Sequence, residues 1–314
     1  MSQTFLKPSH LICISIALAV FALPAQAETH KELGAVNWLR DYDEAIELAE
    51  STGKPILILF QEVPGCHGCV QYGQTTLSHP LIVDAIENAF VPLAIFNNQA
   101  GPDREILKRF DEPAWNFQVM RFIDREGKDI IPRKDRVWTP EATAARMVES
   151  LEKVDRPVPD YLRTVAWRSK TDGIKTAAFS MYCFWDGEAK LGGIDGVLET
   201  ESGWLDGAEV VKLSYDSDHL QWPELVKKAK ALGCAERIYA PDSEALKVTS
   251  EAKLYPMEKY RKARESDQKR HLQFSKLKTL PLNPFQKTKI NSALSQRDVA
   301  VIQQWLSPSQ LESL

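Results

Sequence analysis

The chain has 314 residues, with 39 lysines and arginines against 43 aspartates and glutamates, which gives a formal net charge of −4 at pH 7. Without a basic excess, it is not expected to bind nucleic acid or anionic membrane surfaces. The length is sufficient for two domains with ordinary hydrophobic cores.

Residues 1–27 have the pattern of a secretory signal peptide. The apolar run Leu11–Leu23 follows Lys7 and closes on Ala-Gln-Ala at residues 25–27, a small-residue cleavage site. The run is too short to span a bilayer, and an uncleaved N-terminal anchor is the alternative. Cleavage after Ala27 predicts a periplasmic or secreted protein with no membrane insertion. Four cysteines lie beyond this site: Cys66, Cys69, Cys183 and Cys234.

Residues 28–154 are predicted to form a first, α/β domain. Residues 42–49 have helical spacing, and residues 56–60 are an unbroken apolar run, as expected of a central strand buried on both faces. A mostly helical segment is expected at 70–90, and further strands at 91–96 and 119–123.

The motif Cys66-His67-Gly68-Cys69 directly follows the predicted central strand and opens a helix. This arrangement, within residues 36–152, resembles thioredoxin-like domains. The resemblance implies that Cys66 is the attacking thiol and Cys69 the resolving thiol. A static disulfide and half of a metal site are the alternatives, and neither a metal nor another cofactor is predicted. Such domains usually carry a cis-proline facing the dithiol, and here Gln118 stands near that place.

A linker, a second domain and a C-terminal tail are expected at residues 155–172, 173–294 and 295–314. Prolines at 157 and 159 in the linker disfavour both helix and strand. The second domain is predicted to contain strands at 174–181, 196–202 and 209–216, and helices at 184–191 and 223–232. This order indicates an α+β sandwich. The charged segment 258–269 is interpreted as the solvated face of a helix.

Cys183 is the residue around which the second domain is interpreted. An apolar stretch with β character ends just before it, and residues with helical character follow. The first N–H groups of a helix have no intrahelical partner, so the helix start favours a thiolate. Phe184 and Trp185 would form an apolar wall suited to a thioether. The alternative is a buried structural cysteine packed on two core aromatic rings.

Three motifs occur in order after the linker: Cys-Phe-Trp at 183–185, Gly-Trp-Leu-Asp-Gly at 203–207 and Ala-Glu-Val-Val at 208–211. Together with Gln-Phe-Ser at 273–275, they resemble the A-type peptide-methionine sulfoxide reductases, which reduce the S epimer of methionine sulfoxide. The resemblance covers residues 175–294 and implies a ferredoxin-like α+β sandwich. Phe274 stands where that family has its second active-site tyrosine.

The resemblance implies that the Cys183 thiolate attacks the sulfoxide sulfur and becomes a sulfenic acid. Glu209 would protonate the departing oxygen. Trp204 occupies the turn-tyrosine position and either packs or lines the substrate pocket. Tyr182 either donates a hydroxyl to the site or is an ordinary packing residue. Glu188 is interpreted as a helix-surface or capping carboxylate.

Cys234 is the other cysteine of the second domain, and it is either the resolving thiol or a buried structural residue. If it is out of reach, Cys66 could attack oxidised Cys183 directly. The predicted substrate is oxidised peptide or protein methionine, and an external dithiol donor would complete the cycle. The alternative function is a thiol-disulfide carrier whose second domain binds a thioether without turnover.

Overall fold

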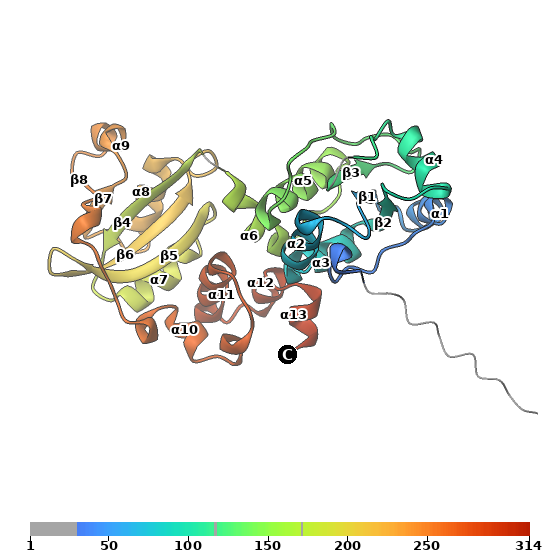
Figure 1. Ribbon diagram of the computed structural model, residues 1–314. Helices are drawn as coiled ribbons and strands as arrows, with labels where there is room; N and C mark the ends of the chain where they lie inside the picture. The colour runs from blue at the N-terminus through green and yellow to red at the C-terminus, as the bar shows by residue number, and fades with distance from the viewer. Residues whose placement is uncertain (1–29, 116–117, 171) are drawn as a thin grey trace, which may run out of the picture.

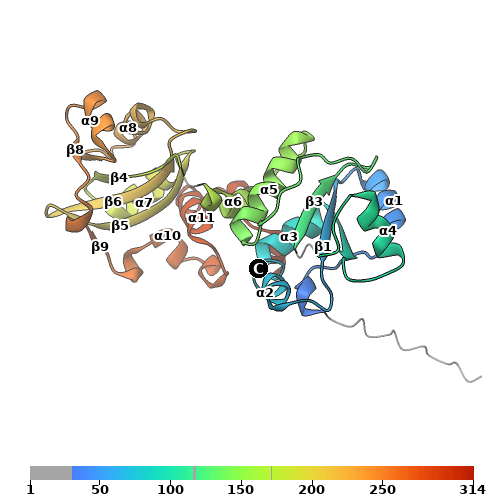
Figure 2. The ribbon, with the colours of Figure 1, turned by 45° about the horizontal axis from the view of Figure 1, so that its top comes forward.

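The computed structural model describes residues 30–115, 118–170 and 172–314 (Figure 1). The predicted signal peptide lies outside these residues. Two bodies, each built on its own sheet, lie side by side and are joined by α6 (Asp160–Ala166) and by the C-terminal helices (Figures 1 and 2). None of the helices in the described part of the chain has the length and apolar character needed to cross a membrane.

The first domain contains a three-stranded sheet in the order β2-β1-β3. The central strand pairs in parallel with β2 and antiparallel with β3. Its strands are β1 (Ile56–Gln61), β2 (Val91–Phe96) and β3 (Val119–Ile123). Its helices are α1 (Tyr42–Thr52), α2 (His67–Thr75), α3 (Pro80–Ala89), α4 (Pro102–Arg109) and α5 (Pro140–Lys153), preceded by the short η1 (Lys31–Leu33).

Every residue of β1 is buried, as its unbroken apolar sequence predicts. Leu57 and Leu59 pack in the cluster that includes α2, α3 and α5, whereas Ile58 and Phe60 pack in the cluster that includes α1 and α4. Alternate side chains of the strand therefore bind helices on both faces of the sheet. The predicted helical segment 70–90 is two helices, because the chain breaks around His79 and restarts with Pro80 at the first position of α3.

The predicted linker contains a helix that packs into the first domain. Pro159 is the N-cap of α6, where proline costs the helix nothing because the first N–H groups have no intrahelical partner. Tyr161, Leu162 and Val165 of α6 are buried in the same cluster as α5. The short η2 (Trp167–Ser169) follows, so the connection to the second domain is much shorter than the sequence suggested.

The second domain has a six-stranded sheet in the order β8-β7-β4-β6-β5-β9. Its strands are β4 (Ile174–Ser180), β5 (Val197–Leu205), β6 (Ala208–Asp216), β7 (Arg237–Ala240), β8 (Lys253–Leu254) and β9 (Arg261–Lys262). Its helices include α7 (Phe184–Gly192), α8 (Trp222–Ala231), α9 (Ser243–Val248) and α10 (Arg270–Gln273). The chain order β4-α7-β5-β6-α8-β7, with β4 central, is the predicted ferredoxin-like α+β arrangement.

One face of this sheet forms the main core of the second domain. Phe179 of β4 and Leu213 of β6 are buried against Leu191 of α7 and Leu225 of α8. The two helices thus cover the same face, as in a two-layer sandwich. Burial of these side chains fixes the position at which β4 ends and α7 begins.

The predicted C-terminal tail is helical and contacts both domains. It follows α11 (Pro284–Gln296) and contains α12 (Val299–Gln304) and α13 (Pro308–Glu312). Asn283 caps α11 and donates a hydrogen bond of 2.7 Å to Thr164 Oγ1 in α6. Ser309 Oγ donates one of 2.6 Å to the buried carboxylate of Asp84 in α3. The C-terminal helices therefore hold the two domains in one arrangement.

Two sequence interpretations of charged residues are wrong. The segment 258–269 is not one helix, because β9 lies in it between two short 3-10 helices, η3 (Met257–Lys259) and η4 (Glu265–Asp267). Glu188 does not lie on the surface: it is fully buried in α7, and Lys269 Nζ lies 2.7 Å from its Oε1. Lys269 also donates its backbone N–H to Glu188 Oε2 at 2.6 Å. The pair links α7 to the segment that precedes α10, a long-range contact that sequence spacing does not indicate.

Replacing Glu188 with alanine leaves the Lys269 ammonium buried without its counter-charge, and the free energy of unfolding is expected to fall by about 3–5 kcal/mol. A Glu188→Leu/Lys269→Met double variant removes both charges and should recover most of that loss. Urea unfolding followed by tryptophan fluorescence measures both effects. If Glu188→Ala is as stable as the wild type, this ion pair does not hold α7 in place.

Candidate functional site

The first pair of thiols lies at the start of α2, shortly after the end of β1. Cys66 is the N-cap of α2 and is exposed, whereas Cys69, in the first turn, is fully buried. Their sulfur atoms are 3.2 Å apart and both thiols are free. A disulfide requires a sulfur separation near 2.05 Å, so small side-chain rotations close it. One accessible thiol beside one buried thiol suits an attacking and a resolving role.

Burial raises the pKa of the Cys69 thiol to about 12, and the hydrogen bond with Cys66 and the charge of Glu62 act in the same direction. Glu62 Oε2 lies 3.9 Å from the Cys69 sulfur. The ligand atoms of Glu62, Cys66 and Cys69 all lie within 4.8 Å of one another. A tetrahedral metal site needs a fourth ligand, and among the described residues no further histidine, cysteine or carboxylate belongs to this group.

The loop before Cys66 is fixed by a buried carboxylate. Glu32 Oε1 accepts a hydrogen bond of 2.7 Å from the Gly65 N–H. A Cβ atom on residue 65 would lie 2.2 Å from the Glu62 carbonyl oxygen, so only glycine fits there. Gln118 also approaches this site, since its Nε2 lies 3.4 Å from where a Cβ on Gly68 would be. The residue near the family's cis-proline position therefore faces the first turn of α2.

The second thiol site lies where β4 gives way to α7. Cys183 is the N-cap of α7 in an extended conformation, is half-buried, and is a free thiol. Its carbonyl oxygen accepts the hydrogen bond from the Gly187 N–H at 3.0 Å, which begins the helix. The strand-to-helix junction predicted for Cys183 is therefore present.

Glu209 lies directly beside Cys183. It comes from β6, and its Oε2 accepts a hydrogen bond of 2.7 Å from the Phe184 N–H, the first N–H of α7. Its other oxygen, Oε1, makes no hydrogen bond within the described residues. The structure thus brings together Cys183 and Glu209, which are 26 residues apart in sequence.

Three aromatic rings stand around this junction. Trp204 is the cross-strand partner of Glu209 in the β5–β6 hairpin. Its ring centroid lies 5.5 Å from that of Phe184, in an edge-to-face arrangement. Trp185 is half-buried, with its ring centroid 6.0 Å from that of Phe184. An apolar wall of the predicted kind therefore exists beside Cys183, and Trp204 belongs to it.

A guanidinium group, absent from the sequence prediction, covers part of this wall. The Cζ atom of Arg270 lies 4.4 Å from the ring centroid of Trp185 and 4.2 Å from that of Phe274. Arg270 thus packs on both the apolar wall and the residue in the family's tyrosine position. It forms no ion pair with any carboxylate of the described residues. Its sequence context, a run of charges, gives no signal that would distinguish it from a solvated arginine.

Tyr182 projects into solvent. It is 91% exposed, immediately before Cys183, and so is not a packing residue. Phe274 is 74% exposed. The surface around Cys183 therefore carries two exposed aromatic side chains.

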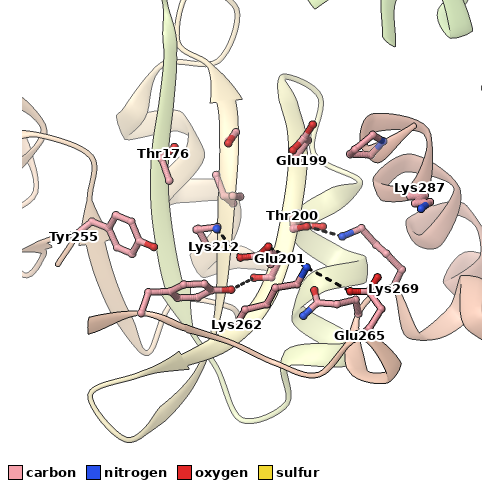
Figure 3. Close-up of a pocket in the computed structure, with 15 residues that line it drawn as sticks. Thr176, Glu199, Thr200, Glu201, Lys212, Tyr255, Lys262, Glu265, Lys269 and Lys287 are labelled. Atoms are coloured by element: carbon pink, nitrogen blue, oxygen red, sulfur yellow. Dashed lines mark hydrogen bonds and ion pairs between the residues drawn. The ribbon is translucent and has the colours of Figure 1, made fainter. Parts of the chain in front are cut away.

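A separate pocket of about 420 Å³ opens beside β5 and β6, away from all four thiols (Figure 3). Lys212 Nζ lies 2.5 Å from Glu201 Oε1, and Lys262 Nζ lies 3.5 Å from Glu201 Oε2. Lys262 Nζ also lies 3.4 Å from Glu265 Oε2, so charged groups of both signs line the pocket.

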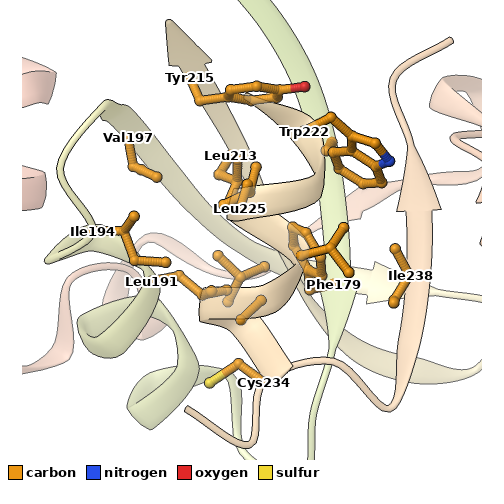
Figure 4. Close-up of a cluster of buried hydrophobic side chains, with 14 of the residues drawn as sticks. Phe179, Leu191, Ile194, Val197, Leu213, Tyr215, Trp222, Leu225, Cys234 and Ile238 are labelled. Atoms are coloured by element: carbon orange, nitrogen blue, oxygen red, sulfur yellow. The ribbon is translucent and has the colours of Figure 1, made fainter. Parts of the chain in front are cut away.

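Cys234 is a core residue. It follows α8 and packs at the edge of the cluster that contains Phe179 and Leu191 (Figure 4). Its thiol donates to the Leu232 carbonyl oxygen at 3.5 Å. Burial raises the pKa of this thiol to about 11. Of the two roles left open for Cys234, this environment favours the structural one.

Comparisons with known proteins identify the first domain. Residues 37–122 match a family described as thioredoxin-like. This segment is a thioredoxin-like domain. It carries the free thiols of Cys66 and Cys69. A solved structure titled DsbH oxidoreductase is 19% identical, with a TM-score of 0.32, and the match covers 41% of this chain and 92% of that one.

The chain is also similar to the peptide methionine sulfoxide reductase MsrA of Methanococcus maripaludis (strain C7 / ATCC BAA-1331). The two are 34% identical over 70 residues, which is 17% of this chain and 45% of the reductase. The chain therefore spans less than half of that relative's length. With the thioredoxin-like match, this similarity confirms the predicted resemblance to both families.

The buried thiols of Cys69 and Cys234 should resist alkylation in the native, reduced protein. Iodoacetamide at pH 8 is expected to modify Cys66 of the thioredoxin-like domain and Cys183, but not Cys234, because the thiolate is the nucleophile and the Cys234 pKa is about 11. Modification of Cys234 should rise as the pH approaches 11. Peptide mass spectrometry measures each site, with urea-unfolded protein as the control. Modification of Cys234 at pH 8 as fast as in the unfolded protein would show that its sulfur is accessible.

Proposed function

We propose that this protein reduces methionine (S)-sulfoxide in peptides, with Cys183 as the nucleophile and the Cys66/Cys69 dithiol as its recycler. The observation that carries the proposal is the 2.7 Å hydrogen bond that holds the Glu209 carboxylate against the helix start occupied by Cys183. It supports the proposal because it brings a thiol and a carboxyl group together beside an apolar wall. Sulfoxide reduction requires these three components.

In the proposed reaction, the Cys183 thiolate attacks the sulfoxide sulfur while Glu209 protonates its oxygen. The oxygen then transfers to the Cys183 sulfur: its bond to the substrate sulfur breaks, a bond to Cys183 forms, and the transient bond between the two sulfur atoms breaks as methionine leaves, so that Cys183 becomes a sulfenic acid. The sulfoxide is reduced by two electrons and the cysteine is oxidised by two. Phe184, Trp185 and Trp204 would contact the methyl and methylene groups of the substrate, and Tyr182 would contact its flanking backbone.

The proposed recycling uses the thioredoxin-like domain. The Cys66 thiolate attacks the sulfenic sulfur, releases water and forms a mixed disulfide, which Cys69 then resolves. The resulting Cys66–Cys69 disulfide would be reduced by an external dithiol donor. We place this cycle in the cell envelope on account of the signal-like pattern of residues 1–27.

One observation favours a second candidate function. The guanidinium of Arg270 lies between the rings of Trp185 and Phe274, where an apolar substrate group would otherwise pack. If Arg270 stays there, the second domain binds partners without turning over a sulfoxide. The protein is then a thiol-disulfide carrier in which only Cys66 and Cys69 exchange electrons.

Anaerobic reaction of the reduced protein with a peptide (S)-sulfoxide, without added reductant, separates the two candidates. The wild type and Cys66→Ser should each form methionine, and Cys183→Ser should form none. Glu209→Gln should slow the first turnover by about 10²–10⁴-fold, because a positioned acid contributes that much. Chromatography of the peptide product gives the yield and rate. Equal yields of methionine from the wild type and Cys183→Ser would rule out the reductase function and support the thiol-disulfide carrier.

A further inference from the structure

The two thiol sites of one molecule lie far apart. Strand β4 starts beside the linker and runs away from the thioredoxin-like domain, and Cys183 follows its outer end (Figures 1 and 2). Its seven residues carry the chain about 20 Å outward, at roughly 3.3 Å per residue. Cys66 lies on α2, on the other side of the linker. Forming a mixed disulfide between them within one molecule would require a large rotation of the domains.

The C-terminal helices oppose such a rotation. Residues of α11 bind the second domain: Lys289 Nζ, almost fully buried, donates to the Ile194 carbonyl oxygen at 2.8 Å, and Thr288 Oγ1 accepts from the Thr200 N–H at 3.2 Å. Asn283, the N-cap of α11, and Ser309 of α13 bind the first domain through their hydrogen bonds to Thr164 and Asp84. Rotating the domains apart would break these two hydrogen bonds.

Ion pairs also join the segment that follows α6 to the second domain. Arg168, beside α6, forms an ion pair of 2.8 Å with Glu199 of the second domain. Lys170 forms one of 2.6 Å with Asp216. Aromatic packing adds to these contacts, since Phe285 of α11 has Trp167 on one side and Trp305 on the other, at centroid distances of 6.2 and 5.5 Å. The interface thus combines polar and aromatic contacts.

Both thiol sites are open to a second molecule. Cys66 is exposed. Tyr182 and Phe274 are similarly exposed beside Cys183. Aromatic side chains of this kind are enriched where proteins associate.

We propose that the dithiol of one molecule reduces the oxidised Cys183 of a second copy of this chain. This inference rests on the proposed function. Cys66 of one copy displaces the sulfenic oxygen of the other as water, giving an intermolecular disulfide. Cys69 then attacks Cys66, which frees the Cys183 thiol and leaves the Cys66–Cys69 disulfide on the first copy. The exposed faces around Cys66 and Cys183 are the docking surfaces of this exchange.

The test mixes two variants, both fully reduced and anaerobic, with an excess of peptide sulfoxide and no added reductant. Cys66→Ser/Cys69→Ser keeps Cys183 and alone should form one methionine per chain. Cys183→Ser keeps the dithiol and alone should form none. An equimolar mixture should form a second methionine per Cys183-containing chain. A mixture with the Cys66→Ser/Cys69→Ser/Cys183→Ser variant is the control and should form no second methionine.

The concentration dependence of the wild type gives an independent result. An exchange between molecules makes the rate of the second methionine rise about tenfold for a tenfold rise in protein concentration, whereas exchange within one chain leaves it unchanged. In Cys69→Ala, the mixed disulfide cannot be resolved, so it should accumulate as a covalent dimer on a non-reducing gel. A concentration-independent second phase, or an internally linked monomer, would overturn the inference.

Failure of the proposed function is distinguishable from failure of this inference. If Cys66→Ser/Cys69→Ser forms no first methionine, the reductase function itself is wrong and the inference falls with it. If it forms the first methionine and the mixture forms no second, the reductase function stands and only the exchange between copies is overturned.

Discussion

The hydrogen bond from the Phe184 N–H to Glu209 is the interaction on which the second site depends. It joins the first turn of α7 to β6, and so it holds the N-cap thiol and the carboxylate in one place. Burial of β4 and α7 in the core determines where that turn lies, and the buried Glu188–Lys269 pair ties the same helix to the segment before α10. The reactive geometry therefore follows from ordinary packing around a helix start.

The dithiol site of the thioredoxin-like domain has the same arrangement. There too a buried strand ends just before a helix whose N-cap is a cysteine, and a nearby carboxylate, Glu62, lies within reach of the thiols. The two sites differ in what accompanies the nucleophile: Cys66 has a buried second thiol in its own first turn, and Cys183 has aromatic rings. The proposed function assigns disulfide exchange to the first site and binding of the substrate's apolar sulfur group to the second. Because the two sites lie far apart in one molecule, the arrangement of the domains restricts the transfer of electrons from the dithiol to Cys183 more than any other proposed step.

Much of the fold was predictable because local pattern and burial agree. The strands β1, β2 and β3, and the start of α7 at Phe184, lie where periodicity and turn chemistry predict them. The similarity of short motifs was enough to bring Cys183 and Glu209 together. The sequence did not indicate α6, the helical tail or the place of Arg270. Each of these depends on contacts between residues far apart in the chain, and secondary-structure propensity, which is a local property, does not predict such contacts.

Trapping of the Cys183 sulfenic acid tests the central claim most directly. The Cys66→Ser/Cys69→Ser variant is incubated anaerobically with a peptide (S)-sulfoxide and dimedone, which reacts with sulfenic acids, and each cysteine is examined by peptide mass spectrometry. We expect a dimedone adduct on Cys183 that requires the sulfoxide and is absent with the corresponding methionine peptide. An unmodified Cys183 under these conditions would contradict the claim that this thiol accepts the sulfoxide oxygen.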